Sequence, residues 1–201
     1  MYLYEMMQNL MESIIKWDQA LFFRINGQWT NTFLDKWLLW FRTSDNWIPF
    51  YVVFLIFLIR KLKVKTWKWL LLAIVNVTLT DQVSSNFFKP IVHRLRPCQD
   101  PLVLDKVKLV VDHCLTSFSF TSSHAANHFG IATFIFFTLQ PLFNNYRYLF
   151  LLWAGIISYA QVYVGVHYPV DVIAGAMIGI ISGWGVAFIY SKWERGALKS
   201  L

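Results

Sequence analysis

The sequence predicts an all-α membrane protein, a polytopic bundle of five to six spanning helices with amphipathic helices at its N-terminus. Of its 201 residues, 57% are hydrophobic and 14% are charged, whereas soluble domains are about 45–50% apolar and about 25% charged. Such a chain would expose large apolar patches in water, so lipid is the better solvent for it. Its length suits a single membrane domain.

Four segments have the length of about 20 mostly apolar residues that a helical span requires. They are residues 66–88, 125–143, 148–166 and 170–190. A fifth segment, residues 47–59, is shorter and contains Pro49, so it spans only if the basic residues that follow it reach the interface. Glycines recur at every fourth position from Gly175 to Gly183, which predicts close packing of the last segment against another helix. We therefore expect residues 47–201 to form the membrane core.

Residues 1–46 are expected to form interfacial helices. Apolar residues recur at helical spacing in the first part of this region, but charged residues interrupt it throughout. The sequence around Gly27 ends the first helix, and residues 32–41 read as a second, short amphipathic helix. The alternative is a true membrane span, which would have to bury Arg24 or Lys36.

Basic residues indicate the orientation in the membrane. They crowd positions 60–68 and follow the last apolar segment, and basic loops mark the cytoplasmic side. The connections at 89–123 and 165–169 then emerge together on the outer face. Because the net charge of +7 resides in such loops, we expect no nucleic-acid partner. The sequence predicts an integral protein of a bacterial inner (plasma) membrane, with its site facing the periplasm or the exterior.

Three cations, Lys89, Arg94 and Arg96, lie at the outer end of the 66–88 segment. Interfacial anchoring explains them poorly, because the positive-inside rule places basic residues on the opposite side. Arginine offers a planar fork that matches phosphate oxygens, and lysine adds a mobile point charge. This cluster therefore predicts an anion site.

A second cluster, Ser122-Ser123-His124, directly precedes the 125–143 segment. A serine here caps the helix, whose first N–H groups and partial positive charge favour a phosphate. Taken alone, a simple cap with a chance histidine is the better interpretation.

A third cluster places His167 four residues before Asp171, at the start of the last apolar segment. On one helical face the carboxylate accepts a hydrogen bond from one imidazole nitrogen and leaves the other nitrogen free as a base or nucleophile. An unpaired aspartate near membrane depth is costly, so it needs such a partner. The alternative interpretation is a purely structural pair.

Together these clusters follow a recognisable pattern of Lys89, six residues, Arg96-Pro97, then Ser122-x-His124, then His167, three residues, Asp171. The pattern resembles the type 2 phosphatidic acid phosphatase family, whose superfamily also contains bacterial acid phosphatases and vanadium haloperoxidases. The resemblance covers about residues 81–179.

The resemblance implies a role for each matching residue. The phosphate would be held by four groups, the side chains of Lys89, Arg96 and Ser122 and the backbone of Ser123. His167 would attack phosphorus to form a phosphohistidine, Asp171 would orient it, and His124 would protonate the leaving oxygen. The resemblance implies no metal and no other cofactor.

Two positions depart from the family pattern. The third motif of the family begins with arginine six residues before the nucleophile, and here that position is Gln161, which can donate a hydrogen bond to the phosphate but brings no charge. Ser123 stands where the second motif has glycine, and its side chain narrows the conformations open to the loop. Arg94 is a candidate to replace the missing charge. Asp81, an acid within the 66–88 segment, is expected to support one of the cations indirectly, without pairing with it directly.

The predicted function is hydrolysis of a lipid phosphomonoester or pyrophosphate. Candidate substrates are undecaprenyl pyrophosphate, phosphatidate, phosphatidylglycerol phosphate and lipid A. One alternative keeps the fold but loses catalysis, giving a protein that binds or transports a lipid phosphate. A soluble acid phosphatase or haloperoxidase is the other alternative, against which the number of apolar segments argues. The sequence leaves the oligomeric state open, and it leaves Cys98 and Cys114 either disulfide-bonded or as two buried thiols.

Overall fold

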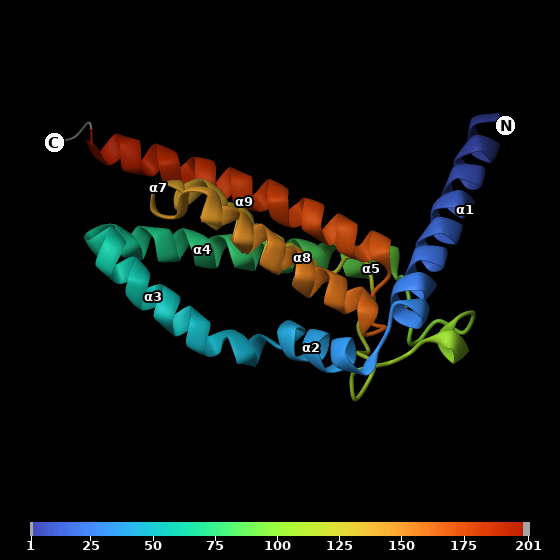
Figure 1. The fold of residues 1–201 in the computed structure, drawn as a ribbon. Helices are drawn as coiled ribbons and strands as arrows, with labels where there is room; N and C mark the ends of the chain where they lie inside the picture. Colours follow the sequence, from blue (N-terminus) through green and yellow to red (C-terminus); the bar gives the residue numbers. More distant parts are fainter. Residues whose placement is uncertain (1, 199–201) are drawn as a thin grey trace.

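The computed structural model describes residues 2–198, which are predominantly helical and contain no strand (Figure 1). Four helices form the central bundle: α4 (Thr66–Asp81), α6 (Ser123–Thr138), α8 (Tyr148–Tyr163) and α9 (Pro169–Leu198). The others are α1 (Tyr2–Phe23), α2 (Thr32–Arg42), α3 (Ile48–Leu62), α5 (Lys89–Val92) and α7 (Gln140–Phe143). Figure 1 shows α1 projecting from one end of the bundle and α3 running along its side. The predicted all-helical fold is confirmed.

The predicted spans correspond to helices, with one irregularity near the site. Residues 66–92 are helical throughout, but a wider π-type turn, Gln82–Phe88, separates α4 from α5. Pro90 follows this turn and cannot donate a backbone hydrogen bond to the preceding turn of helix, which favours such a bulge. Within the described residues one helical stretch, Pro169–Arg195, is by itself long and apolar enough to cross a membrane. The number of five to six spans therefore stays a prediction.

The glycines of α9 pack directly onto α6, as their spacing predicts. A Cβ atom on Gly175, Gly179 or Gly183 would lie 2.4 Å from a backbone carbonyl oxygen of the 122–130 segment. No side chain fits at that distance, so the two backbones touch along three successive turns. This contact fixes α9, and with it the residues at its first turn, against the start of α6.

The N-terminal region is attached to the end of the bundle where α8 meets α9, which we name the outer end after its predicted orientation. The side-chain amide of Asn26 donates to the carbonyls of Lys108 and Tyr163, both at 2.7 Å, and accepts from the Lys108 N–H at 2.8 Å. Asn31 caps α2 by accepting from the N–H of Leu34 at 2.9 Å. The helix predicted at 32–41 is thereby confirmed, whereas the interfacial position of residues 1–46 stays a prediction.

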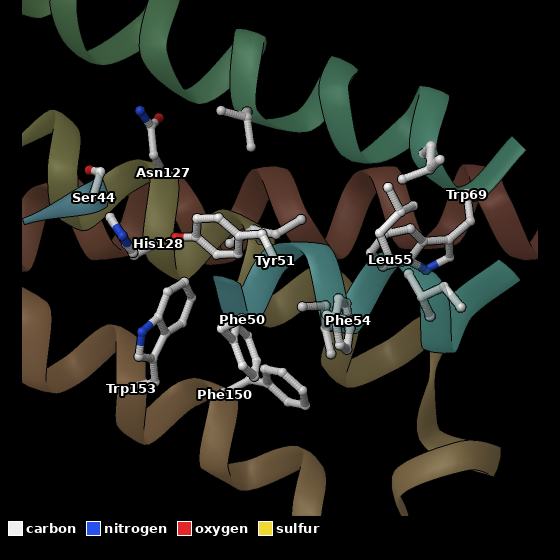
Figure 2. Close-up of a pocket in the computed structure, with 15 residues that line it drawn as sticks. Ser44, Phe50, Tyr51, Phe54, Leu55, Trp69, Asn127, His128, Phe150 and Trp153 are labelled. Carbon is white, nitrogen blue, oxygen red and sulfur yellow. The ribbon is translucent and has the colours of Figure 1, made fainter. Parts of the chain in front are cut away.

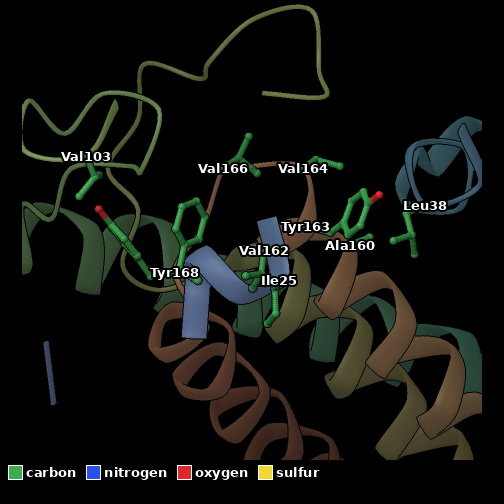
Figure 3. Packing of buried hydrophobic residues seen from close by; sticks show 10 residues of the cluster. Ile25, Leu38, Val103, Ala160, Val162, Tyr163, Val164, Val166 and Tyr168 are labelled. Carbon is green, nitrogen blue, oxygen red and sulfur yellow. The ribbon is translucent and has the colours of Figure 1, made fainter. Parts of the chain in front are cut away.

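Two apolar cores stabilise the two ends of the molecule. The core at the outer end gathers residues from the N-terminal region, the 98–121 connection and the junction of α8 with α9 (Figure 3). The other core joins α3, α4, α6 and the end of α9. A disulfide between Cys98 and Cys114, whose Cα atoms are 6.0 Å apart, closes part of the outer connection. Of the two states left open for these cysteines, the structure has the disulfide.

The contact between α6 and α9 predicts that Gly179→Ala is destabilising. Its new Cβ would meet the carbonyl oxygen of Ala126 and the amide nitrogen of Gly130 at 2.4 and 2.7 Å, and overpacking of this kind costs about 1–3 kcal/mol. Gly185→Ala is the matched control, because a Cβ there has no neighbour within 4 Å and alanine favours a helix by about 1 kcal/mol over glycine. The thermal unfolding midpoint in detergent should fall for Gly179→Ala only. Equal midpoints would contradict the packing described here.

Candidate active site

The carboxylate of Asp171 lies at the centre of the candidate site, in the first turn of α9, and is 0% exposed. One oxygen, Oδ2, accepts from the hydroxyl of Ser119 at 2.5 Å and from the backbone N–H of Tyr168 at 2.9 Å. The same oxygen faces Nδ1 of His167 at 3.6 Å. The predicted proximity of His167 and Asp171 is present, and Ser119 bridges the two side chains.

The hydrogen bonds of His167 determine which ring nitrogen carries its proton. Its Nε2 lies 3.1 Å from Nη1 of Arg96, and its Nδ1 lies 3.2 Å from Oγ of Ser119. A guanidinium can only donate, so Nε2 must accept and the proton resides on Nδ1. This tautomer points the N–H toward Ser119 and Asp171 and leaves a lone pair on Nε2. It is the state that a nitrogen nucleophile requires.

Burial, the largest cause, and the charges of Arg96 and Lys89 together lower the pKa of His167 to about 4 against the opposing effect of Asp171. A ring with this pKa is neutral at pH 7, because deprotonation is complete well below that pH. The lone pair on Nε2 of His167 is therefore present at pH 7 without a prior proton transfer.

Two predicted phosphate-binding cations differ in their surroundings. Arg96 is 1% exposed, and its guanidinium donates to Ser117 and to the carbonyl of Val166 as well as to His167. Burial lowers the pKa of Arg96 to about 10, so it stays charged. Lys89 is half-buried and has no hydrogen bond or ion pair to the described residues. Burial, followed by the charge of Arg96, lowers the pKa of Lys89.

The second cluster forms the start of α6. Ser122 is its N-cap, and the backbone N–H of Ser122 donates to the carbonyl oxygen of Asp171 at 3.0 Å, which joins the second cluster to the third. The hydroxyl of Ser123, at the position of the family's glycine, lies 2.8 Å from that of Ser85. The ring of His124 lies within electrostatic reach of Arg96 and His167.

Arg94 does not replace the missing cation, contrary to expectation. Its guanidinium pairs with Asp18 of α1 on one side and with Asp171, at 2.6 Å, on the other. It also lies over the ring of Tyr168, 4.2 Å from the centroid. Because these two carboxylates neutralise its positive charge, Arg94 links α1 to the site and does not attract a further anion.

Asp81 makes no ion pair within the described residues, and it acts on a cation only indirectly, as expected. Its Oδ1 accepts from Ser85 at 3.4 Å and from Asn127 at 3.5 Å. Its charge acts on Lys89 only from a distance.

Gln161 is 0% exposed and lies next to His167. Its backbone carbonyl accepts from the N–H of His167 at 3.2 Å. Its side-chain oxygen accepts from Nη2 of Arg42 at 3.1 Å, so a residue of α2 reaches the site. Sequence reasoning missed three partners, Ser119, Asp18 and Arg42. Of these three residues, only Arg42 could have been suggested by the sequence, because it follows Asp35 by seven residues and therefore lies on the same face of an amphipathic helix.

An apolar cavity of about 420 Å³ lies between α3, α4, α6 and α8 (Figure 2). Aromatic and aliphatic side chains form most of its wall, among them Phe50, Phe54 and Trp153. His128 and Asn127 are among its few polar lining residues. Nδ1 of His128 lies 2.7 Å from the carbonyl oxygen of His124, so the cavity adjoins the cluster at the start of α6.

A neutral, oriented imidazole among cations and a helix N-terminus, carried by an apolar helical bundle, defines a phosphoric ester hydrolase of membrane type. The chain belongs to the PAP2 superfamily, whose family model matches residues 66–195. It is 31% identical over 190 residues to a lipid A 4'-phosphatase of Porphyromonas gingivalis, covering 91% of this chain and 78% of the relative.

Two further comparisons agree with this assignment. A lipid A 4'-phosphatase of Bacteroides thetaiotaomicron is 36% identical over 166 residues, which cover 80% of this chain and 71% of the relative. The crystal structure of Aquifex aeolicus LpxE superimposes with a TM-score of 0.62 at 32% identity, covering 84% of this chain and 93% of that structure. Both support the PAP2 fold described here.

The surroundings of His167 predict an unusually acidic titration. Its pKa near 4, against about 6.5 for a free histidine, keeps the ring neutral at pH 5.5. Nitrogen NMR of protein labelled on histidine, with a His167→Gln variant to assign the signal, should show Nδ1 protonated and Nε2 unprotonated down to about pH 5. Because the folded state disfavours the proton, this group contributes stability that is lost as pH falls from about 6.5 to about 4. A ring that titrates near 6.5 would contradict the description.

Proposed function

We propose that this protein hydrolyses a phosphate ester of a membrane lipid through a covalent phosphohistidine at Nε2 of His167. The observation that carries the proposal is the state of that ring, with Nδ1–H directed at Ser119 and Asp171 and Nε2 directed at Arg96. Cations and free helix N–H groups around Nε2 suit the charge that develops on phosphoryl oxygens.

The chemistry divides into two displacements at phosphorus. In the first, Nε2 of His167 bonds to phosphorus while the bond to the lipid oxygen breaks, and His124 gives its proton to that oxygen. The bound phosphate anion favours the protonated form of His124. In the second, His124 takes a proton from water, whose oxygen displaces His167 and releases inorganic phosphate. Asp171 stabilises the positive charge on His167 in between.

Lys89 and Arg96 are proposed to bind the phosphoryl oxygens, together with Ser122 and the backbone N–H of Ser123. Arg96 has to redirect the N–H that it now gives to Nε2 of His167, and this exchange frees the lone pair when a phosphate arrives. Lys89 has no partner of its own within the described residues to give up. No step requires a metal or another cofactor.

The apolar cavity supports a lipid as the substrate, because its largely hydrocarbon walls include His128, one turn of α6 away from His124. Two relatives that match most of this chain are named lipid A 4'-phosphatases. We therefore place a phosphate of lipid A first among the four candidate lipids. Undecaprenyl pyrophosphate, phosphatidate and phosphatidylglycerol phosphate complete the panel for the assay.

The site is proposed to face the periplasm or exterior, in a bundle of five to six spans. Lys65 and Lys68 both pair with Glu194 near the C-terminal end of α9, whereas His167 and Asp171 lie at its beginning. The basic loops and the site therefore occupy opposite ends of the bundle, as the positive-inside rule requires for an outward-facing site.

Detergent-purified protein should release inorganic phosphate from at least one lipid of the panel without added metal. His167→Ala should lower the rate by a factor of about 10⁴ or more, because the nucleophile is lost. Brief reaction with ³²P-labelled substrate followed by alkaline quenching should leave label on the wild-type protein, since phosphohistidine survives alkali. His113→Ala, a change on the exposed surface of the outer connection, serves as the control.

Retained activity in His167→Ala would contradict the phosphohistidine route. No release from any lipid by folded wild-type protein would instead favour a protein that binds or transports lipid phosphates.

A further inference from the structure

We infer that Arg42 is a phosphate-binding residue, carried into the site by α2 and held there by Gln161. The inference deepens the proposed function and rests on it, because it assumes that the anion bound beside His167 is a phosphate group. It adds a cation from a helix that lies outside the residues matched by the family model.

The position of Arg42 follows from how α2 is attached. Asp35 accepts from the ammonium of Lys108, at 2.7 Å to each oxygen, and from the hydroxyl of Tyr163 at 2.8 Å. Leu38, three residues later, is buried in the outer core. Arg42 follows at the spacing of the same helical face, so this face turns toward α8 along the length of α2 and presents Arg42 to Gln161.

The guanidinium of Arg42 has donors that the described residues leave unused. Its Nη2 donates to the side-chain oxygen of Gln161 at 3.1 Å. Its Nε is enclosed and has no hydrogen-bond partner among those residues. A buried donor without a partner is destabilising, so an acceptor that occupies this place would stabilise the site.

The charge of Arg42 is also unbalanced. Arg94 is neutralised by Asp18 and Asp171, whereas Arg42 forms no ion pair with any described residue. It lies close enough to Arg96 and to His124 for its charge to act on both. Positive groups that repel one another at a site favour the binding of an anion from outside.

Gln161 thereby acquires a role different from the one expected for it. Its side-chain oxygen is engaged by Arg42, so we assign it as a positioning residue that acts through the guanidinium. An arginine at position 161 would place a cation in the same region from α8. Here the neutral amide of Gln161 accepts the hydrogen bond of a cation that α2 supplies, and the positive charge at the site is retained.

The test measures the affinity of the full-length, detergent-purified protein for inorganic phosphate by isothermal titration calorimetry. Arg42→Gln should weaken binding by about 10- to 100-fold, as expected for loss of hydrogen bonds from a charged donor. The phosphate affinity of Arg42→Lys should lie between those of the wild type and Arg42→Gln. Lys36→Gln, which removes an exposed cation from the same helix, should bind phosphate as the wild type does.

A charge exchange separates a binding role from a merely structural one. The double variant Arg42→Gln, Gln161→Arg returns a cation to the site from α8, so it should recover most of the phosphate affinity that Arg42→Gln loses. Thermal unfolding of every variant shows whether folding is intact. If Arg42→Gln does not fold, the phosphate affinities of Arg42→Lys and of the double variant are compared with that of the wild type. This comparison then tests whether Arg42 binds phosphate.

Wild-type affinity in Arg42→Gln would overturn the inference, as would a folded double variant that binds no better than the single one. Failure of the proposed function is visible separately. A wild-type protein that binds phosphate through Arg42 but hydrolyses no lipid would retain this inference and reject catalysis.

Discussion

A carboxylate removed from solvent must be surrounded by donors, and the arrangement of the site depends on how Asp171 meets this requirement. Its carboxylate oxygens accept hydrogen bonds from Arg94, Ser119 and the N–H of Tyr168. Its backbone carbonyl accepts one from the N–H of Ser122. These partners come from three separate parts of the chain, around residues 94, 119–122 and 168. Satisfying one buried charge therefore brings the start of α6, the outer connection and the beginning of α9 to the same place, and through Arg94 it holds α1 there as well.

Three arginines at the site serve three different purposes because their partners differ. Arg94 is neutralised by two acids and acts as a structural link. Arg96 is surrounded by carbonyl oxygens and the imidazole of His167, which keep it charged but let one N–H be exchanged for a better acceptor. Arg42 has a neutral amide and an unused donor. An anion is attracted by the latter two, while the first keeps the site assembled.

The sequence was sufficient for the helices and for the residues that contact one another locally. His167 and Asp171 are four residues apart at a helix start, and Ser122 precedes its helix directly, so local geometry determines both. The partners of Arg94 and Gln161 were out of reach, because Asp18 lies 76 positions from Arg94 and Arg42 lies 119 positions from Gln161. Such pairings depend on how helices pack, and no local pattern records which of two nearby arginines meets a carboxylate.

The two sides of the bundle differ in rigidity. Along α6 and α9 the backbones touch at three glycines, and there is no side chain whose rotation could open a gap. On the opposite side α3 meets its neighbours through aromatic rings around a cavity, and rings can shift. On the proposed function, the reacting end of the substrate would lie against the rigid side and its hydrocarbon end against the compliant one. We therefore expect such an enzyme to discriminate more strictly among head groups than among acyl chains of different length and number.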